Sequence, residues 1–221
     1  MFETIYNILA RYGGVYIEGL IGTLWLAAVT VVLGTLIGTL LAVMGLGRIK
    51  LLHAFVRFYV WILRGTPILL QLYFFWIFLP RVLPFELSDT ACIVTALIVN
   101  ASSYVSEIIR AGIQAVDRGQ EEAARSLGLD GLKTMRYVVL PQAIKNILPA
   151  LGNEFINMIK QVSLASVFFI NELTTSYRTV LSATYRPVES ILIAGAIYLF
   201  LTTVLTYIMD RFEMNLKRSE A

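Results

Sequence analysis

Long apolar runs separated by short polar segments dominate the chain. Five of these runs approach or exceed the roughly 20 residues that a helix needs to cross the hydrocarbon core of a bilayer. Because backbone polar groups cannot be left unpaired in lipid, each run is predicted to form a transmembrane helix. The five predicted spans are residues 19–44, 54–79, 90–113, 148–170 and 190–209. An all-α integral membrane protein with a single domain over residues 1–221 follows from this pattern.

The longest polar stretch, residues 114–146, separates the third and fourth spans. Its first part predicts a short helix that is capped by Asp117, carries Glu121 in its first turn and ends at Gly128 in a left-handed conformation. A second short helix is predicted for residues 132–139, before Pro141 starts the next element. So short a helix is marginal alone in water, so it rests either on this chain's own bundle or on a separate protein.

Two local patterns inside the spans predict helix packing and bending. Gly34 and Gly38 stand four residues apart in the first span, a spacing that lets a neighbouring helix approach closely within the subunit or in a dimer. Pro67 removes a backbone hydrogen bond from the second span and is expected to kink it. The kink serves either as a gate hinge or as a static bend.

Composition supports a membrane protein and excludes several kinds of chemistry. The chain is 57% hydrophobic and only 15% charged, against about 25% in soluble domains. The single cysteine, Cys92, cannot form an internal disulfide. The single histidine, His53, is not accompanied by other residues in a metal-binding spacing. One His and one Cys do not supply the groups of an intramembrane enzyme. A phosphate-binding loop of the G-x-x-x-x-G-K-[ST] type is also missing from the sequence.

The distribution of Lys and Arg predicts the orientation in the membrane. Five spans place the two termini on opposite sides, and the side richer in Lys and Arg is expected to be cytoplasmic. One side carries four such residues: Arg11, Arg81, Arg178 and Arg186. The other carries thirteen: Arg48, Lys50, Arg57, Arg64, Arg110, Arg118, Arg125, Lys133, Arg136, Lys145, Arg211, Lys217 and Arg218. The N-terminus is therefore predicted outside and the C-terminus in the cytoplasm, and the basic pI of about 9.0 needs no nucleic-acid partner.

Polar side chains inside the spans are candidates for function, since they are unfavourable in lipid. The fourth span carries five of them within an arc of roughly 120° on a helix: Asn153, Glu154, Asn157, Lys160 and Gln161. Such a stripe faces either a translocation path or another helix or subunit that it holds in place.

The best candidates for the path are Glu154 and Asn157 of the fourth span with Asn100 and Ser103 of the third. Glu172 follows the outer end of the fourth span and is a candidate for the external mouth. Three other charged residues are expected to be paired instead: Glu107 with Arg110 at the cytoplasmic end of the third span, and Lys160 with a carboxylate.

The polar loop also resembles a known family. Glu122-Ala123-Ala124, three residues, Gly128, nine residues and then Val138-Val139-Leu140-Pro141 is similar to the EAA loop of bacterial ABC importer permeases, E-A-A-x3-G-x9-I-x-L-P. The spacing matches throughout, with Val138 where the family usually has Ile. By this resemblance Glu122, Ala123, Ala124, Gly128, Leu140 and Pro141 belong to the contact with the ATPase, and the first short helix is the coupling helix.

The resemblance covers nearly the whole chain apart from the extreme N-terminus. Arg64-Gly65-Thr66-Pro67 with Gln71, residues 104–112 (YVSEIIRAG) and residues 152–155 (GNEF) are similar to the polar amino-acid branch, the histidine, glutamine and arginine type. It implies the type I ABC importer permease fold in the bacterial inner membrane and a second permease subunit, identical or homologous. It also implies two copies of a cytoplasmic ATPase, which holds ATP and Mg²⁺, an extracytoplasmic solute-binding protein and a polar amino acid as substrate.

The chain itself is then expected to bind no cofactor and to catalyse no reaction. The main alternative is a secondary amino-acid transporter or channel that works without ATP, although no repeated halves are visible in the sequence. A structural membrane adaptor is a further alternative. The sequence does not identify the amino acid that is carried.

Overall fold

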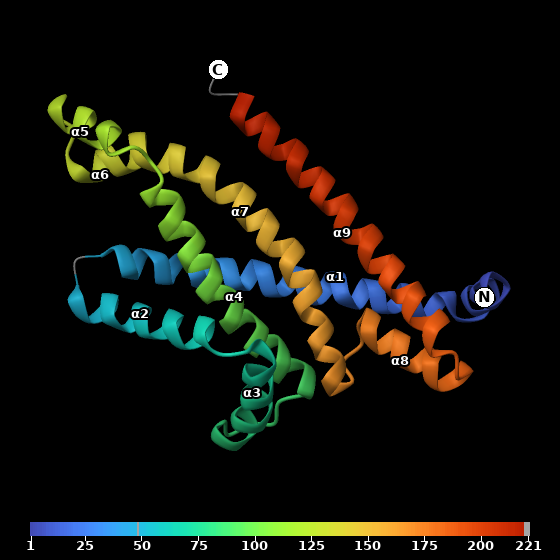
Figure 1. The fold of residues 1–221 in the computed structure, drawn as a ribbon. Coiled ribbons are helices and arrows are strands. Elements are labelled where there is room, and N and C mark those ends of the chain that lie inside the picture. The colour runs from blue at the N-terminus through green and yellow to red at the C-terminus, as the bar shows by residue number, and fades with distance from the viewer. Residues whose placement is uncertain (48, 219–221) are drawn as a thin grey trace.

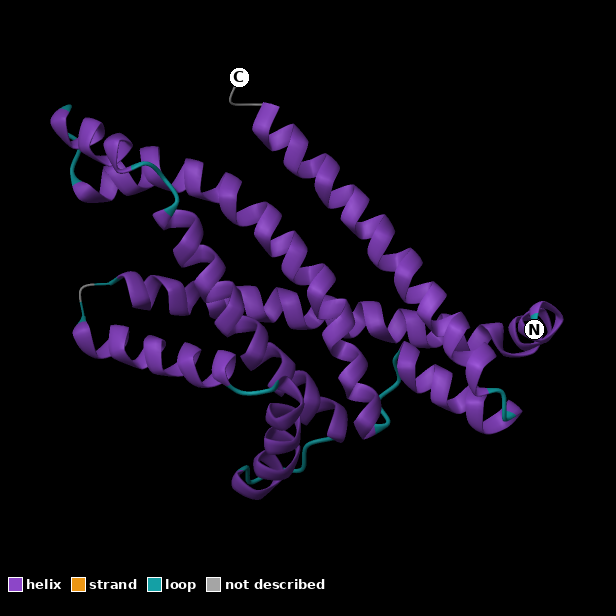
Figure 2. Ribbon diagram, viewed as in Figure 1, coloured by secondary structure: helices purple, strands orange, loops and turns teal. Residues whose placement is uncertain are grey.

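Every regular element in the described residues, 1–47 and 49–218, is helical in the computed structural model (Figure 1, Figure 2). The elements in chain order are α1 (Phe2–Leu46), α2 (Lys50–Gly65), α3 (Ile68–Val82), α4 (Asp89–Gln114), α5 (Arg118–Ser126), α6 (Gly131–Thr134), the π-helix η1 (Met135–Val139), α7 (Leu140–Gln161), the 3₁₀-helix η2 (Val162–Phe168), α8 (Leu173–Thr184) and α9 (Pro187–Arg218). The all-helical prediction is confirmed.

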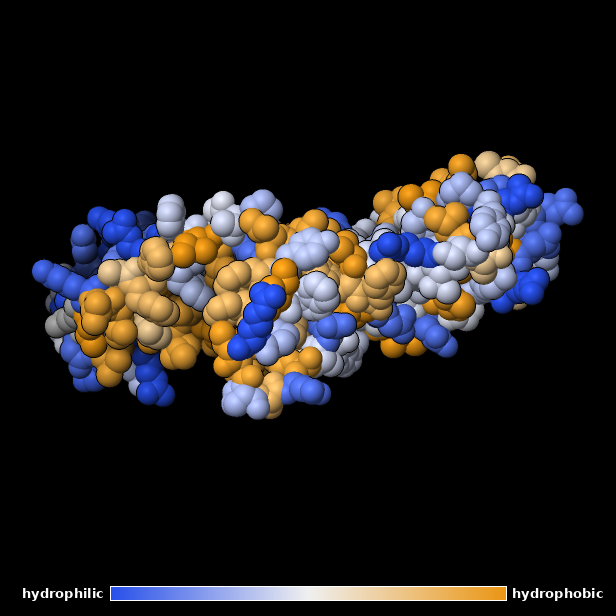
Figure 3. Space-filling view, turned by 90° about the horizontal axis from the view of Figure 1, so that it is seen from below, coloured by the Kyte–Doolittle hydropathy of each residue, from blue (hydrophilic) through white to orange (hydrophobic). Residues whose placement is uncertain are grey.

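Three helices of the described chain are long and apolar enough to cross a membrane, namely α1, α4 and α9. They contain the first, third and fifth predicted spans. Large apolar side chains such as Leu36, Leu199 and Phe200 are 64–72% exposed on them. Figure 3 shows apolar surface over much of one face, with hydrophilic groups gathered toward its two ends. This is the surface expected of a helix bundle in lipid.

The second predicted span is divided into α2 and α3, which meet at an angle of 109°. The predicted kink at Pro67 is therefore present, but it breaks the helix. Proline disfavours the helical conformation in the residue before it. Thr66 accordingly has an extended backbone (φ −120°, ψ 146°). A continuous span over residues 54–79 does not form, and the pair counts as one bent span or as a re-entrant segment.

The fourth span also differs from the predicted residues 148–170. Its helix α7 begins at Leu140, with Pro141 in the first turn, and the α-helix ends at Gln161. The chain continues as the 3₁₀-helix η2 to Phe168. The helix starts earlier because Pro141 is favourable in a helical first turn, so Gln142, Lys145 and Asn146 join the helix ahead of the predicted apolar run. α7 is not among the helices apolar enough to be counted as spans.

The short helix α8 was not predicted from the sequence. It packs with the N-terminal part of α1 and the start of α9 in a small apolar cluster of its own, whose buried members are Ile8, Tyr16, Leu173, Val180, Ile193 and Ala194. This packing extends α1 to 45 residues, well beyond the first predicted span. The longer helix is thus stabilised by tertiary contacts and not by its propensity alone.

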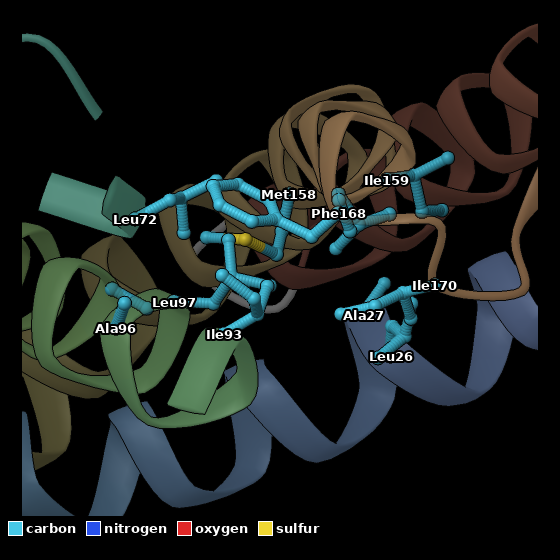
Figure 4. Packing of buried hydrophobic residues seen from close by; sticks show 13 residues of the cluster. Leu26, Ala27, Leu72, Ile93, Ala96, Leu97, Met158, Ile159, Phe168 and Ile170 are labelled. Atoms are coloured by element: carbon cyan, nitrogen blue, oxygen red, sulfur yellow. The ribbon is translucent and has the colours of Figure 1, made fainter. Parts of the chain in front are cut away.

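The main core lies where α1, α3, α4, α7 and η2 meet, and Figure 4 shows its side chains pointing toward one another. The most extensive contact joins α1 and α4. A Cβ atom on Gly34 would lie 2.8 Å from the Ala101 Cβ, and one on Gly38 would lie 2.7 Å from the Val105 Cβ. The predicted close packing at these glycines is therefore found, and it occurs within the subunit.

Candidate coupling and translocation sites

The coupling helix predicted from the sequence is α5, and its two ends form as its residues indicate. The Asp117 side chain accepts a hydrogen bond from the Gly119 N–H at 2.7 Å. Gly128 has a φ of +86°, and its N–H donates to the Arg125 carbonyl at 2.9 Å. Nothing lies within 4 Å of a Cβ at Gly128, so glycine is needed there for its conformation and not for space.

The surface of α5 is only partly covered by this chain. Ala124 is buried against the rest of the loop, whereas Glu122 and Ala123 are exposed. Two leucines beside them are almost free of protein contact: Leu127 is 85% exposed and Leu132 is 80% exposed. Exposed apolar side chains at the polar end of a bundle indicate a protein contact, because lipid does not cover them there.

The second half of the loop is joined directly to α7. α6, the π-helix η1 and α7 follow one another without a break from Gly131 to Gln161 (Figure 1). Leu140 and Pro141 therefore belong to the first turn of α7 and not to a flexible connector. A displacement of α6 acts on the polar stripe of α7 through one continuous helical path.

A buried amide repairs the break between α2 and α3. Pro67 has no N–H to pair with the Leu63 carbonyl, which lies four residues before it. The Gln71 side chain takes that place, since its Nε2 donates to the Leu63 carbonyl at 2.8 Å and to the Thr66 hydroxyl at 2.8 Å. Its Oε1 accepts from Asn100 Nδ2 at 2.8 Å. Gln71 thereby ties the break to α4, a role that the sequence analysis missed although a glutamine within an apolar run was a visible signal.

The four path candidates lie on α4 and α7 and face the protein interior. Asn100, Ser103 and Glu154 are buried and Asn157 is half-buried. The Ser103 hydroxyl donates to the Asn100 carbonyl of its own helix at 2.7 Å. In these four candidates, two buried oxygens have no hydrogen-bond partner among the described residues, Asn100 Oδ1 and Glu154 Oε1. Unsatisfied buried acceptors of this kind are unfavourable unless a donor arrives from outside the chain.

Lys160 differs from its prediction. No carboxylate of the described residues lies within ion-pair distance of it, and the side chain is exposed beside Ser163, Thr174, Tyr198 and Thr202. The expected pairing within the chain is therefore not found. The reason is geometric: Glu154 is buried while Lys160 is exposed, so the polar stripe is divided between the interior and the surface of the subunit.

Glu172 has a structural place as the N-cap of α8. Its carboxylate accepts hydrogen bonds from the Thr175 N–H at 2.6 Å, the Thr174 N–H at 2.8 Å and the Tyr198 hydroxyl at 2.9 Å. Burial raises the pKa of the Glu172 carboxyl, and these donors oppose that rise by favouring the charged form. A role at the external mouth stays a prediction.

The predicted pair of Glu107 and Arg110 is present and larger than expected. Arg110 donates to both carboxylate oxygens of Glu107, at 2.9 Å and 2.7 Å. Arg64 from the end of α2 adds a second ion pair to Glu107 at 3.5 Å and lies over the Tyr104 ring at 5.2 Å. The cluster holds the end of α2 against α4.

Comparisons with known proteins agree with this architecture. A family model described as "Binding-protein-dependent transport system inner membrane component" matches residues 34–218. The chain belongs to that family. It is thus a membrane-embedded subunit of a transport system, as the resemblance of its polar loop predicts.

Among the described residues there is no group of three or more His, Cys, Asp or Glu that could hold a metal ion.

Relatives and solved structures add detail. The arginine transport system permease protein ArtQ of Bacillus subtilis is 38% identical over 204 residues, which cover 92% of this chain and 93% of that protein. The nopaline transport system permease protein NocM of Agrobacterium fabrum is 39% identical, over 83% of this chain and 80% of the relative. The crystal structure of an amino acid ABC transporter with histidines is similar with a TM-score of 0.90 and 43% identity, over 94% of this chain and 96% of that one.

The methionine ABC transporter MetNI in an inward-facing conformation shares the fold, with a TM-score of 0.74 at 19% identity over 91% of this chain and 96% of that one. The permease fold inferred from the loop spacing is therefore present in this chain.

Proposed function

We propose that this permease subunit carries a polar or charged amino acid inward, in an importer driven by a separate ABC ATPase. The observation that carries the proposal is α5, a capped helix with an exposed face at one end of the bundle. It is followed in the chain by the continuous helical segment from α6 to α7. The names of the similar permeases, which refer to arginine, nopaline and glutamine transport, support an amino-acid substrate.

The partners follow from the same assignment. Two copies of a cytoplasmic ATPase bind ATP and Mg²⁺, and α5 seats in a groove of one of them through Glu122, Ala123 and Leu127. A second permease subunit, identical or homologous, completes the pathway. An extracytoplasmic solute-binding protein delivers the substrate. The chain itself binds no cofactor and hydrolyses no ATP.

Force passes from α5 to α7 through the packing of α5 on α6 and η1. When the ATPase dimer closes, it moves α5 and α6 as a unit, and α6 continues through η1 into α7. Rigid-body rocking of α7 then changes access to the polar residues it carries. The π-helical segment absorbs part of this motion, since such segments often mark functional sites in helices.

The substrate path runs beside α4 and α7. Glu154 and Asn100 each present an unpaired buried oxygen, which suits the ammonium group of an amino acid. Lys160 presents an exposed ammonium that makes no ion pair with the described residues, which suits the substrate carboxylate. Ser103 and Asn157 line the same region. We place the N-terminus outside and the C-terminus in the cytoplasm, in agreement with the excess of Lys and Arg on the α5 side.

The substitution Glu122→Lys tests the coupling assignment. It reverses an exposed charge on α5 without touching the buried face. We expect amino-acid uptake to fall roughly tenfold, which corresponds to ~1.4 kcal/mol of lost docking free energy. The tagged protein should insert normally and recover less ATPase in affinity purification. The matched control is Glu86→Lys, an exposed glutamate in the loop between α3 and α4.

Three results are distinguishable. Reduced uptake with reduced ATPase recovery supports the coupling role of α5. Normal uptake by the inserted Glu122→Lys protein contradicts that role while leaving the family membership intact. Purification of the unmodified chain with no ATPase at all would favour a transporter that works without ATP.

A further inference from the structure

A hollow of about 630 Å³ lies between the ends of α1, α2 and α4, apart from the coupling helix and from the polar stripe of α7. Its lining includes His53, Arg57 and Trp61 of α2 and Arg110 of α4. α4 ends at Gln114 and α5 begins at Arg118, so the hollow lies at the end of the bundle that carries α5. Nothing in the transport cycle described above uses it.

Arg57 supplies the positive charge in the hollow that has no ion-pair partner among the described residues. Arg110 is fully engaged, because it donates to both Glu107 oxygens and to the Gln114 amide oxygen at 2.6 Å. Glu107 is in turn neutralised by Arg110 and Arg64. Arg57, by contrast, is exposed and makes no ion pair with the described residues.

His53 stands one helical turn before Arg57 on the same face of α2. Its Nδ1 lies 2.8 Å from the Gly45 carbonyl. A carbonyl oxygen only accepts, so Nδ1 carries the proton and Nε2 stays open. His53 and Arg57 therefore present two neighbouring polar groups toward the same space, and the second is a permanent cation.

Apolar side chains share the lining with these polar groups. Trp61, one further turn along α2, is 71% exposed and stacks on Phe58 with their ring centroids 6.1 Å apart. Leu46, at the end of α1, also lines the hollow and is 42% exposed. The hollow therefore combines a cation that has no ion pair in the described residues with exposed apolar surface.

We propose that this hollow binds an anionic phospholipid. The Arg57 guanidinium holds the phosphate oxygens in a bidentate arrangement, His53 Nε2 accepts a hydrogen bond from a headgroup hydroxyl, and an acyl chain covers Trp61 and Leu46. A lone phosphate would satisfy Arg57 but leave the indole and the leucine uncovered. A ligand with a charged head and an apolar tail satisfies both halves, and the surrounding membrane supplies it. The site requires only that α2 lies against lipid.

Native mass spectrometry of the purified transporter complex tests the proposal. The complex is released from detergent in the presence of equal amounts of phosphatidylglycerol and phosphatidylcholine, and the bound lipid is counted. We expect retention of phosphatidylglycerol in preference to phosphatidylcholine, and a loss of about fivefold in that preference for Arg57→Gln. Arg57→Lys should keep part of it. Arg81→Gln removes the same charge from an exposed position at the end of α3 and should change nothing.

A second measurement locates the lipid. The complex is placed in vesicles that contain brominated phosphatidylglycerol, and the fluorescence lost on Trp61→Phe gives the signal of Trp61 alone. We expect stronger quenching of Trp61 by brominated phosphatidylglycerol than by brominated phosphatidylcholine, unaffected by 10-fold excess inorganic phosphate over lipid.

The opposing results are equally defined. Displacement by inorganic phosphate would show a simple anion site and overturn the lipid assignment. Equal retention of both lipids, or an unchanged preference in Arg57→Gln, would overturn it as well. The same holds if Trp61 is not quenched at all, because another subunit then covers the hollow.

Discussion

Single side chains at unusual positions carry most of the chemistry of this permease. Pro67 interrupts a span, Gln71 supplies the hydrogen bonds that the proline removes, and Lys160 stands exposed without a carboxylate among the described residues. Each of these residues is polar or helix-breaking within an apolar segment. In lipid such a residue must find a partner, so each one identifies either an internal bond or an external ligand.

Replacing Gln71 tests the internal bond. Gln71→Leu leaves the Leu63 carbonyl and the Asn100 amide without their partners in a buried setting. We expect the free energy of unfolding of the purified complex to fall by about 2–4 kcal/mol, since each unsatisfied buried group costs about 1–3 kcal/mol. Thermal unfolding followed by size-exclusion chromatography measures the loss. Gln142→Leu, which removes a single half-buried bond to the Val138 carbonyl, should cost about 1 kcal/mol or less.

Replacing Lys160 tests the external ligand. If its ammonium binds the substrate carboxylate, Lys160→Met should lower the uptake rate at subsaturating substrate by roughly 10- to 100-fold, the range for a charged hydrogen bond. The amount of protein in the membrane should not change, because the side chain is exposed. Lys160→Arg should restore part of the uptake. Uptake equal to that of the unmodified protein would assign Lys160 to contact with another subunit or with lipid headgroups.

At the scale of whole elements, small residues set how closely the helices approach. α1 and α4 pack at Gly34 and Gly38, and α1 packs on the start of α8 at Gly19 and on the loop before α8 at Gly22. Without a hydrophobic driving force between helices in lipid, such close van der Waals contact is a main source of their association. The element boundaries depend on these contacts, as the extension of α1 along α8 shows.

The contact between α1 and α4 can be tested at Gly38. A Cβ there would lie 2.7 Å from the Val105 Cβ and 2.8 Å from the Ser102 carbonyl. Gly38→Leu should therefore force the two helices apart and destabilise the protein by about 1–3 kcal/mol, the usual range for overpacking. The matched control is Gly13→Leu in the same helix, where nothing lies within 4 Å of the added Cβ. Equal thermal stability of the two variants would contradict the packing argument.

At the scale of the whole molecule, the proposed function depends on linking two ends of the bundle. One end carries α5 and the exposed Leu127 and Leu132, and the other carries α8 with its separate apolar cluster. The continuous path from α6 through η1 to α7 runs from the α5 end of the bundle to the polar stripe of α7. A subunit of this shape transmits motion, whereas its energy source and the remainder of the pathway belong to other chains under the proposed function.

The predicted orientation is also a property of the whole molecule. A green fluorescent protein fused to the C-terminus should fluoresce, because this reporter matures in the cytoplasm, and an epitope at the N-terminus should be reached by antibody from outside the cell. Opposite sides for the two termini require an odd number of crossings. Both termini on one side would show that α2 and α3 together do not cross the membrane, and would replace the count of five by four.

The sequence alone determined the features that depend on local chemistry. Hydrophobic run length predicted the helices in α1, α4 and α9, and capping residues predicted α5 from Asp117 to Gly128. The spacing of the polar loop predicted the family to which the chain belongs. These features need no knowledge of how distant segments meet.

Tertiary structure decided everything that depends on contacts between distant residues. Whether Pro67 bends or breaks the span depends on bonds between helices, since Gln71 of α3 bonds to the Leu63 carbonyl of α2 and to Asn100 of α4. Whether Lys160 has a partner depends on which side of α7 is covered by neighbouring helices. A polar stripe in a sequence shows that one face of the helix does not face lipid. Only the packing of the helices decides which of its polar groups are buried and which stay accessible to a ligand.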